Sequence, residues 1–106
     1  METDRCIVIQ DLHPRTRYHY LVIPKRHIKN IWYLQYDDDE LVEHMIETVK
    51  RILPQDDVKF GFHSPYITRM NHLHMHAMRG DLKVSRLRFW IEFGNKLLFK
   101  DALEYV

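Results

Sequence analysis

The sequence has little cysteine, glycine and proline, and it has no long hydrophobic run. Its 106 residues include one cysteine, three glycines and four prolines. A single cysteine, Cys6, cannot form an intrachain disulfide, which excludes a disulfide scaffold and fits a reducing compartment. No apolar stretch approaches the roughly 20 residues that cross a bilayer, and no signal peptide is visible. We therefore expect a soluble intracellular domain with no membrane partner, in the cytoplasm and, as a second compartment, the nucleus.

An excess of charge of one sign is also absent. The chain carries 16 basic and 15 acidic residues, and its formal net charge is +1 with histidine neutral. A balanced chain offers no electrostatic footprint for nucleic acid, so we expect no nucleic-acid partner. The length indicates one domain, residues 1–106. The compositional excess is histidine, with eight residues in this short chain.

Hydrophobic periodicity predicts an α+β domain, with an antiparallel β-sheet and one main helix packed on it. Strands are expected at residues 5–11, 18–23, 58–62 and 72–78. The turn at residues 12–15 contains Pro14 and should join the first two strands as an antiparallel pair. Arg79-Gly80-Asp81 is expected to break the fourth strand.

The main helix is expected between an N-cap at Asp37 or Asp38 and Pro54, which should end it. The apolar residues that recur there at helical spacing are Leu41, Val42, Met45, Ile46, Val49, Ile52 and Leu53. We assign this face to the hydrophobic core, with no chemical role. After the fourth strand, we expect a short strand at residues 96–99 and a C-terminal helical segment that starts at Asp101.

Three histidines alternate with two apolar residues in the stretch HLHMH, residues 72–76. Side chains two apart in a strand point to the same face. We therefore expect Leu73 and Met75 to face a core, while the three imidazoles form a row on the other side. Burying imidazoles without partners is costly, so they should meet a ligand, a metal ion or one another.

This row of imidazoles allows three interpretations. In the first, the histidines are structural and bond backbone carbonyls. In the second, they bind zinc and leave its fourth position open. However, three in-line residues span about 13 Å, and a zinc–nitrogen shell of about 2.0–2.1 Å does not easily collect both ends. In the third, which we favour, one imidazole is a nucleophile toward phosphorus, because an unperturbed pKa of about 6.5 leaves the neutral form abundant.

In the third interpretation, the central His74 attacks phosphorus and forms a covalent phosphohistidine-type intermediate. A neighbouring histidine or a backbone carbonyl accepts the proton on its other nitrogen and so fixes its tautomer. Another histidine donates to the phosphoryl oxygens, where charge develops. This chemistry requires no metal and no organic cofactor.

The residues around this row resemble two sequence blocks of a known family. The stretch HLHMHAM, residues 72–78, is similar to the His-φ-His-φ-His-φ-φ signature (φ apolar) of the histidine triad (HIT) superfamily. Upstream, Asp11 with its proline-containing turn and the stretch HYLVIPKRHI, residues 19–28, resemble a second block of that superfamily. Residues 61–66, the main helix and the aromatic tail are most similar to the branch called histidine triad nucleotide-binding protein 3, an adenosine 5′-monophosphoramidase.

The resemblance implies a HIT-like fold and a nucleotide hydrolase. The substrate would be a purine nucleotide, an AMP-like group joined to an amine or acyl leaving group through a P–N or P–O bond, cleaved through a nucleotidyl-histidine intermediate. The family usually has a helix and a strand before the position of Arg5 that help wall the base pocket. We expect both to be missing here. A homodimer is expected by analogy with relatives.

Four histidines are carried over as catalytic residues by the resemblance. His74 would be the nucleophile that takes the nucleotidyl group, and His76 would bind and polarise the phosphate. His72 would orient the site through its hydrogen bonds. His19 aligns with a further active-site histidine close to the triad. His27 is left outside this set, as a loop or helix-start residue.

Five residues are carried over as nucleotide-binding residues. Asp11 aligns with the carboxylate that accepts from two neighbouring ribose hydroxyls. Gln10 and Leu12 flank it and would line the nucleoside pocket. His63 stands where related branches place a polar residue near the phosphate. Arg69 stands where many relatives have a serine, and its guanidinium could clamp phosphate.

A second class of function, a nucleotide-binding module, is kept as an alternative to the enzyme. In this alternative, the domain binds nucleotides but turns them over very little, and it acts through protein–protein interaction. An exposed sheet edge and the aromatic tail would then form the partner surface. AMP binding without hydrolysis of several leaving groups would favour this function.

Overall fold

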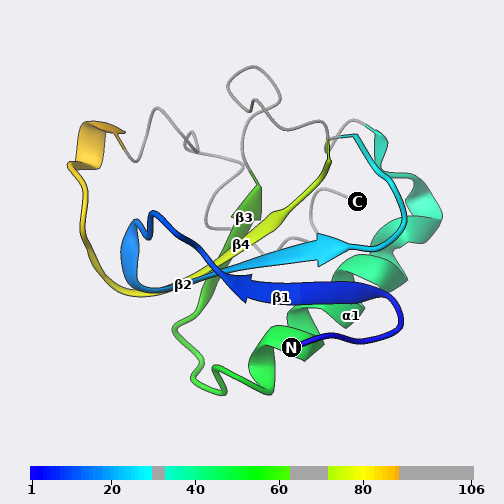
Figure 1. The fold of residues 1–106 in the computed structure, drawn as a ribbon, viewed down its shortest axis with the longest axis horizontal. Coiled ribbons are helices and arrows are strands. Elements are labelled where there is room, and N and C mark those ends of the chain that lie inside the picture. Colours follow the sequence, from blue (N-terminus) through cyan, green and yellow to red (C-terminus); the bar gives the residue numbers. More distant parts are fainter. Residues whose placement is uncertain (30–32, 63–71, 89–106) are drawn as a thin grey trace.

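The computed structural model describes residues 1–29, 33–62 and 72–88. Its elements, in chain order, are β1 (Cys6–Gln10), β2 (Thr16–Pro24), the 3₁₀ helix η2 (Tyr36–Asp38), α1 (Asp39–Lys50), β3 (Lys59–Phe62) and β4 (Met75–Leu82) (Figure 1). The strand expected at 96–99 and the helical segment expected from Asp101 lie outside the described residues, as do His63 and Arg69.

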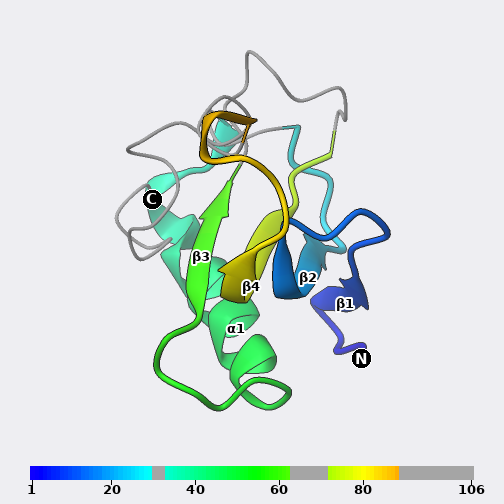
Figure 2. The same cartoon turned by 90° about the vertical axis from the view of Figure 1, so that its left-hand side faces the viewer.

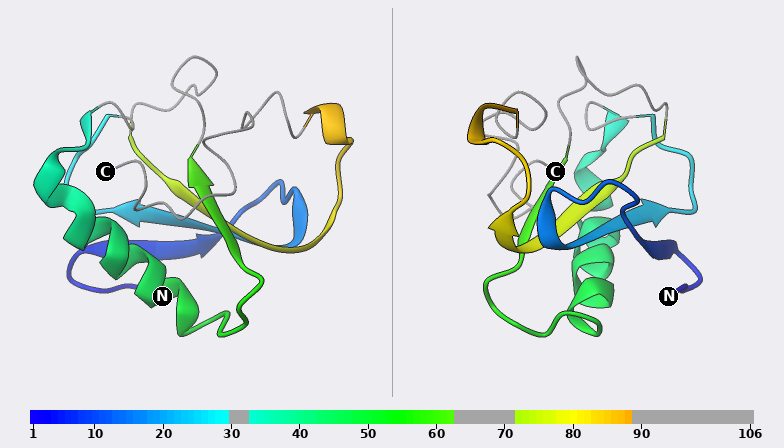
Figure 3. Two further views of the ribbon diagram at one scale, coloured as in Figure 1. Left: turned by 180° about the vertical axis from the view of Figure 1, so that it is seen from behind. Right: turned by 60° about the vertical axis from the view of Figure 1, so that its left-hand side comes forward.

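The four strands form one antiparallel sheet in the order β1-β2-β4-β3. Figure 2 shows β3 and β1 at its two edges, with β4 and β2 between them. Helix α1 crosses one face of the sheet, as the views from opposite sides in Figures 1 and 3 show. The predicted α+β class and the antiparallel pairing of the first two strands are therefore confirmed. Among the described residues, no helix is both long and apolar enough to span a membrane.

Alternation along the strands sorts side chains onto the two faces of the sheet. The buried strand residues that join α1 in one apolar cluster are Cys6, Val8, Val22, Phe62, Met75 and Ala77. His76 lies between Met75 and Ala77 in the chain, and His19 is three residues before Val22. Both histidines are therefore out of phase with the core positions and point to the face opposite α1.

Helix α1 follows the predicted periodicity, and its buried apolar residues are Leu41, Val42, Met45, Ile46 and Val49. It ends at Lys50, so the predicted end at Pro54 is wrong. The N–H groups of Ile52 and Leu53 both donate to the carbonyl of Val49 in a closing turn. Pro54 disfavours the α region only for Leu53, so it limits the closing turn but does not explain why α1 ends at Lys50.

Strand β4 starts at Met75, three residues after the predicted start at His72. Its neighbour β2 ends at Pro24, which has no N–H to offer to a ladder. The N–H of Leu73 donates instead to the carbonyl of Ile28, 2.6 Å away. His72 therefore precedes the strand, although Leu73 and Met75 are buried in the core as expected.

Strand β4 continues through residues 79–81, where the predicted break is wrong. The register shifts opposite the stretch between Thr16 and Tyr18, so β4 accommodates one residue more than β2. Gly80 takes up this extra length with a φ of 98°. A Cβ at this position would lie 2.9 Å from the Cβ of Arg17, so glycine allows the strand to continue through a bulge.

Candidate active site

The predicted catalytic histidines meet where β4 begins beside β2. His19, His74 and His76 are buried, and His72 is half-buried. The ring centroids of His74 and His76 lie 5.0 Å apart, as do those of His19 and His76. Three rings therefore form one cluster, and His72 joins it through its backbone rather than its ring.

The backbone sets the orientation of the His74 ring. Its Nδ1–H donates to the carbonyl oxygen of His72, 3.1 Å away. A carbonyl oxygen can only accept, so Nδ1 carries the proton and Nε2 keeps a lone pair in the neutral ring. This is the tautomer that an imidazole needs in order to attack through Nε2.

The peptide group between His72 and Leu73, whose carbonyl accepts the hydrogen bond from His74, is itself held by the segment that follows β2. The Nε2–H of His72 donates to the carbonyl oxygen of Pro24, 2.8 Å away. The bond from the Leu73 N–H to Ile28 belongs to the same peptide unit as the His72 carbonyl. Residues 24–28 therefore fix the acceptor that decides the tautomer of His74.

His27 adds a contact that the sequence pattern does not identify. Its Nδ1 lies 3.4 Å from Nδ1 of His72, and the two rings meet edge to face. Since His72 donates through Nε2, its Nδ1 can accept a proton donated by His27. The two residues are 45 positions apart, and nothing in the local pattern around His27 indicates this pairing.

The hydrogen bond between His19 and His76 has a defined donor and a defined acceptor. The backbone N–H of Arg15 donates to Nδ1 of His19, 2.9 Å away. In the neutral ring the proton of His19 is then on Nε2, which donates to Nδ1 of His76 at 2.7 Å. Nε2 of a neutral His76 therefore carries a proton, as a donor to a phosphate requires.

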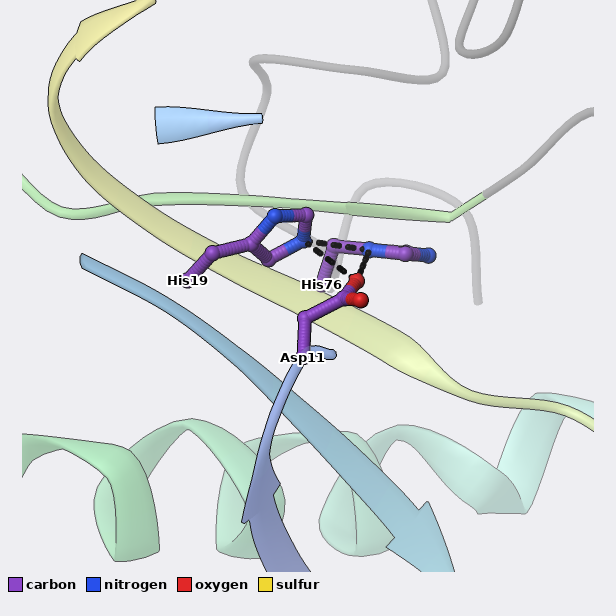
Figure 4. Close-up of side chains that lie close together, drawn as sticks. All are labelled: Asp11, His19 and His76. Carbon is purple, nitrogen blue, oxygen red and sulfur yellow. Dashed lines mark hydrogen bonds and ion pairs between the residues drawn. The ribbon is translucent and has the colours of Figure 1, made fainter. Parts of the chain in front are cut away.

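Asp11 completes this group, and Figure 4 shows its carboxylate directed at both rings. Its Oδ2 lies 3.4 Å from Nε2 of His19 and 4.0 Å from Nδ1 of His76. Its Oδ1 accepts the backbone N–H of His13 at 2.8 Å, and its own N–H donates to the carbonyl of His19. The turn after β1 thus holds the carboxylate against the histidine pair.

The ligand atoms of Asp11, His19 and His76 lie within 4.8 Å of one another, close enough to suggest a metal site. A histidine that binds a metal usually donates its other ring N–H to an acceptor. Here Nδ1 of His19 faces the donating N–H of Arg15 instead. With a metal on Nε2, the neutral His19 ring would carry its proton on Nδ1, where it would point at the N–H of Arg15. The donor set therefore favours a hydrogen-bonded imidazole pair over metal binding.

A cavity of about 150 Å³ opens beside Asp11 and His19, on the β1–β2 side of the site. Its lining residues are Gln10, Asp11, Pro14, Arg17, Tyr18, His19 and Tyr20. Gln10 and Asp11 therefore line the same cavity, and their contact with a nucleoside stays a prediction. Leu12 is 90% exposed and is not among these residues.

The fold and these residues define an α+β domain with a histidine cluster set on a four-stranded sheet. A family model described as "Scavenger mRNA decapping enzyme C-term binding" matches residues 1–88. Together with the relatives below, this match shows that the chain belongs to the histidine triad superfamily.

Two curated relatives are similar to this chain. HINT4 of Arabidopsis thaliana, described as a bifunctional adenosine 5′-phosphosulfate phosphorylase/adenylylsulfatase, is 40% identical over 80 residues, 70% of this chain and 55% of that protein. HINT3 of Mus musculus, described as an adenosine 5′-monophosphoramidase, is 36% identical over 83 residues, 73% of this chain and 50% of that protein. The chain spans about half the length of these relatives.

Solved structures share the fold. A HIT family hydrolase from Legionella pneumophila superposes with a TM-score of 0.69 at 24% identity, over 81% of this chain and 83% of that one. The aprataxin orthologue Hnt3, solved in complex with DNA, gives a TM-score of 0.56 at 22% identity, over 74% of this chain and 50% of that one. At these identities the likeness supports the fold alone.

Proposed function

We propose that this domain hydrolyses adenosine 5′-monophosphoramidates and acyl-AMP compounds through a nucleotidyl-His74 intermediate. The hydrogen bond from His74 Nδ1–H to the His72 carbonyl carries this proposal, because it leaves Nε2 as the nucleophilic nitrogen. The descriptions of HINT3 and HINT4 as enzymes of adenylyl compounds support the substrate class.

In the first step, His74 Nε2 forms a bond to the α-phosphorus while the bond to the leaving nitrogen or oxygen breaks. An amine departs only after protonation, because an amide anion is a poor leaving group. The Nε2–H of His76 donates a hydrogen bond to the phosphoryl oxygens, and the imidazolium form of His76 gives this proton to the leaving atom and becomes neutral. The buried position of both rings removes competing water and strengthens these interactions.

In the second step, water attacks the phosphorus of nucleotidyl-His74 and the N–P bond breaks. A neighbouring histidine, His76, takes the proton from that water as general base. AMP leaves, the electron pair of the N–P bond returns to Nε2 of His74, and Nδ1–H stays bonded to the His72 carbonyl. No step draws on a metal or an organic cofactor.

The nucleoside is held at the β1–β2 side of the site. Asp11 accepts from the ribose hydroxyls, and Gln10 lines the adjoining cavity. Leu12, His63 and Arg69 stay predicted nucleotide contacts. A homodimer, the absence of a nucleic-acid partner and the cytoplasmic and nuclear location also stay predictions. The Hnt3–DNA structure makes DNA a necessary control ligand in binding assays.

The test is hydrolysis of a fluorogenic adenosine phosphoramidate by wild type and His74→Ala, each with and without a chelator. We expect wild-type turnover that ignores the chelator, and a loss of at least about 10³-fold in His74→Ala. The matched control is His44→Gln on α1, whose ring bonds Thr3 outside the site. Full turnover by His74→Ala would overturn the proposal, and AMP binding by a folded wild type without any turnover would favour the binding module instead.

A further inference from the structure

The carboxylate of Asp11 touches the histidine pair as well as the cavity. Its Oδ2 is 3.4 Å from His19 Nε2 and 4.0 Å from His76 Nδ1, while its Oδ1 is anchored by the backbone of His13. A residue that only bound ribose would not need to point at these two nitrogens. We propose that Asp11 is also a positioning residue, which stabilises a proton on the His19–His76 pair for delivery to the leaving group. This inference rests on the proposed function.

The hydrogen bond between the two rings points to Nδ1 of His76 as the place for an additional proton. With both rings neutral, His19 Nε2–H donates to His76 Nδ1 at 2.7 Å. A proton added at His76 Nδ1 would bring two N–H groups face to face. His19 cannot turn its proton to Nδ1, because the Arg15 N–H occupies that side. A negative charge close to both N–H groups stabilises such a charged pair, and Oδ2 of Asp11 lies 3.4 Å from His19 Nε2 and 4.0 Å from His76 Nδ1.

Electrostatics favour the same assignment. The side chains of His19 and His76 are 0% and 4% exposed, so burial alone disfavours an imidazolium. A carboxylate within about 4–6 Å offsets that cost by favouring the charged form. The Asp11 side chain is itself only 13% exposed, so solvent screens this attraction weakly. Among the residues that the structure describes, the ring of His74 also lies against His76, and it needs to stay neutral in order to attack.

The proton returns at the end of each cycle. In the first step, the His74–phosphorus bond forms, the phosphorus–nitrogen bond breaks, and the leaving nitrogen takes the Nε2 proton of the His76 imidazolium. Neutral His76 then has a lone pair on Nε2. In the second step, that lone pair takes a proton from the attacking water and the imidazolium is restored. The sum is substrate plus water giving AMP plus amine.

The experiment separates the ribose role of Asp11 from its role at the histidine pair. Wild type and Asp11→Asn are assayed on an alkylamine phosphoramidate of adenosine and on its 2′,3′-dideoxy counterpart, which has no ribose hydroxyls. The 4-nitrophenyl ester of AMP serves as a substrate whose leaving group needs no proton. Asparagine keeps an oxygen for the His13 N–H, and circular dichroism checks folding of the variant.

We expect Asp11→Asn to lower kcat on both alkylamine substrates by about 10–10²-fold, less than the roughly 10²–10⁴-fold that a proton-transferring group itself contributes, because Asp11 acts through the histidine pair. The loss on the 4-nitrophenyl ester should be only a few-fold. Gln10→Ala, which alters the same cavity without touching the histidine pair, should raise KM equally for both leaving groups.

Two results would overturn the inference while leaving the proposed function intact. One is an Asp11→Asn loss that vanishes on the dideoxy substrate, and the other is an equal loss in kcat for both leaving groups. Failure of wild type to hydrolyse any of the substrates would instead overturn the proposed function, and the inference with it.

Discussion

Replacing Asp38 tests how the start of α1 is held. Asp38 is 3% exposed and occupies the N-cap position, as the sequence predicts, but its side chain makes no bond to the first turn of α1. Its Oδ2 accepts the backbone N–H of Gln35 at 2.7 Å, and its Oδ1 pairs with the guanidinium of Arg26. Burial works against ionisation of Asp38, yet these hydrogen bonds and the charge of Arg26 hold its pKa below the usual value.

The expected cost of Asp38→Ala follows from these contacts. The side chain of Arg26 is 60% exposed, so the ion pair itself contributes at most about 1 kcal/mol. The Gln35 N–H loses a charged acceptor, which is worth about 1.5 kcal/mol at the low end of such bonds. We expect a loss of about 2 kcal/mol in the free energy of unfolding at pH 7, measured by urea denaturation. Asp38→Asn keeps one acceptor oxygen but loses the ion pair with Arg26, so it should lose at most about 1 kcal/mol.

The pH dependence gives a second readout for Asp38. Because the folded pKa is lower than the unfolded value of about 3.9, the charge of Asp38 stabilises the fold above that value. This contribution is lost as pH falls through the folded pKa, so wild type and Asp38→Asn should converge in acid. Asp37→Asn, at the exposed neighbouring carboxylate, is the control. A difference between wild type and Asp38→Asn that does not change with pH, or an equal loss in Asp37→Asn, would refute this reasoning.

Three further changes have defined outcomes. Gly80→Ala should cost about 1–3 kcal/mol by thermal unfolding, because of the positive φ and the close Cβ of Arg17; an unchanged Tm would contradict the bulge. Met45→Ala empties a fully buried core position and should cost about 2–5 kcal/mol, whereas Met45→Leu should cost less than about 1.5 kcal/mol. His27→Ala should lower kcat a few-fold at nearly constant KM, because His27 acts only through His72. A change confined to KM would argue for a substrate contact instead.

Sequence patterns were sufficient to predict the elements that depend only on interactions between residues close together in the chain. The apolar spacing of α1 and the turn at Pro14 act over a few residues, so both could be predicted from the sequence. The ends of β4 could not, because they depend on the neighbouring strand. Pro24 removes a ladder donor at one end, and Gly80 carries the strand through a bulge at the other.

The site shows the same division between local and tertiary information. The alternating pattern predicts that His72, His74 and His76 act together, but it does not say which nitrogen of each ring carries a proton. Those assignments depend on backbone groups brought close by folding, the Arg15 N–H and the His72 carbonyl. The contact of His27 with His72 is equally tertiary and has no local signal.

The most direct test of the central claim is to trap the intermediate on His74. Wild type would be mixed with an adenosine phosphoramidate, quenched rapidly without acid because phosphoryl–imidazole bonds are acid-labile, and digested after arginine. Cleavage at Arg69 and Arg79 yields the peptide of residues 70–79, which holds all three triad histidines. Fragmentation by mass spectrometry should place one adenylyl group on His74 and none in His74→Ala. An adenylyl group on His72 or His76, or undiminished turnover by His74→Ala, would contradict the claim.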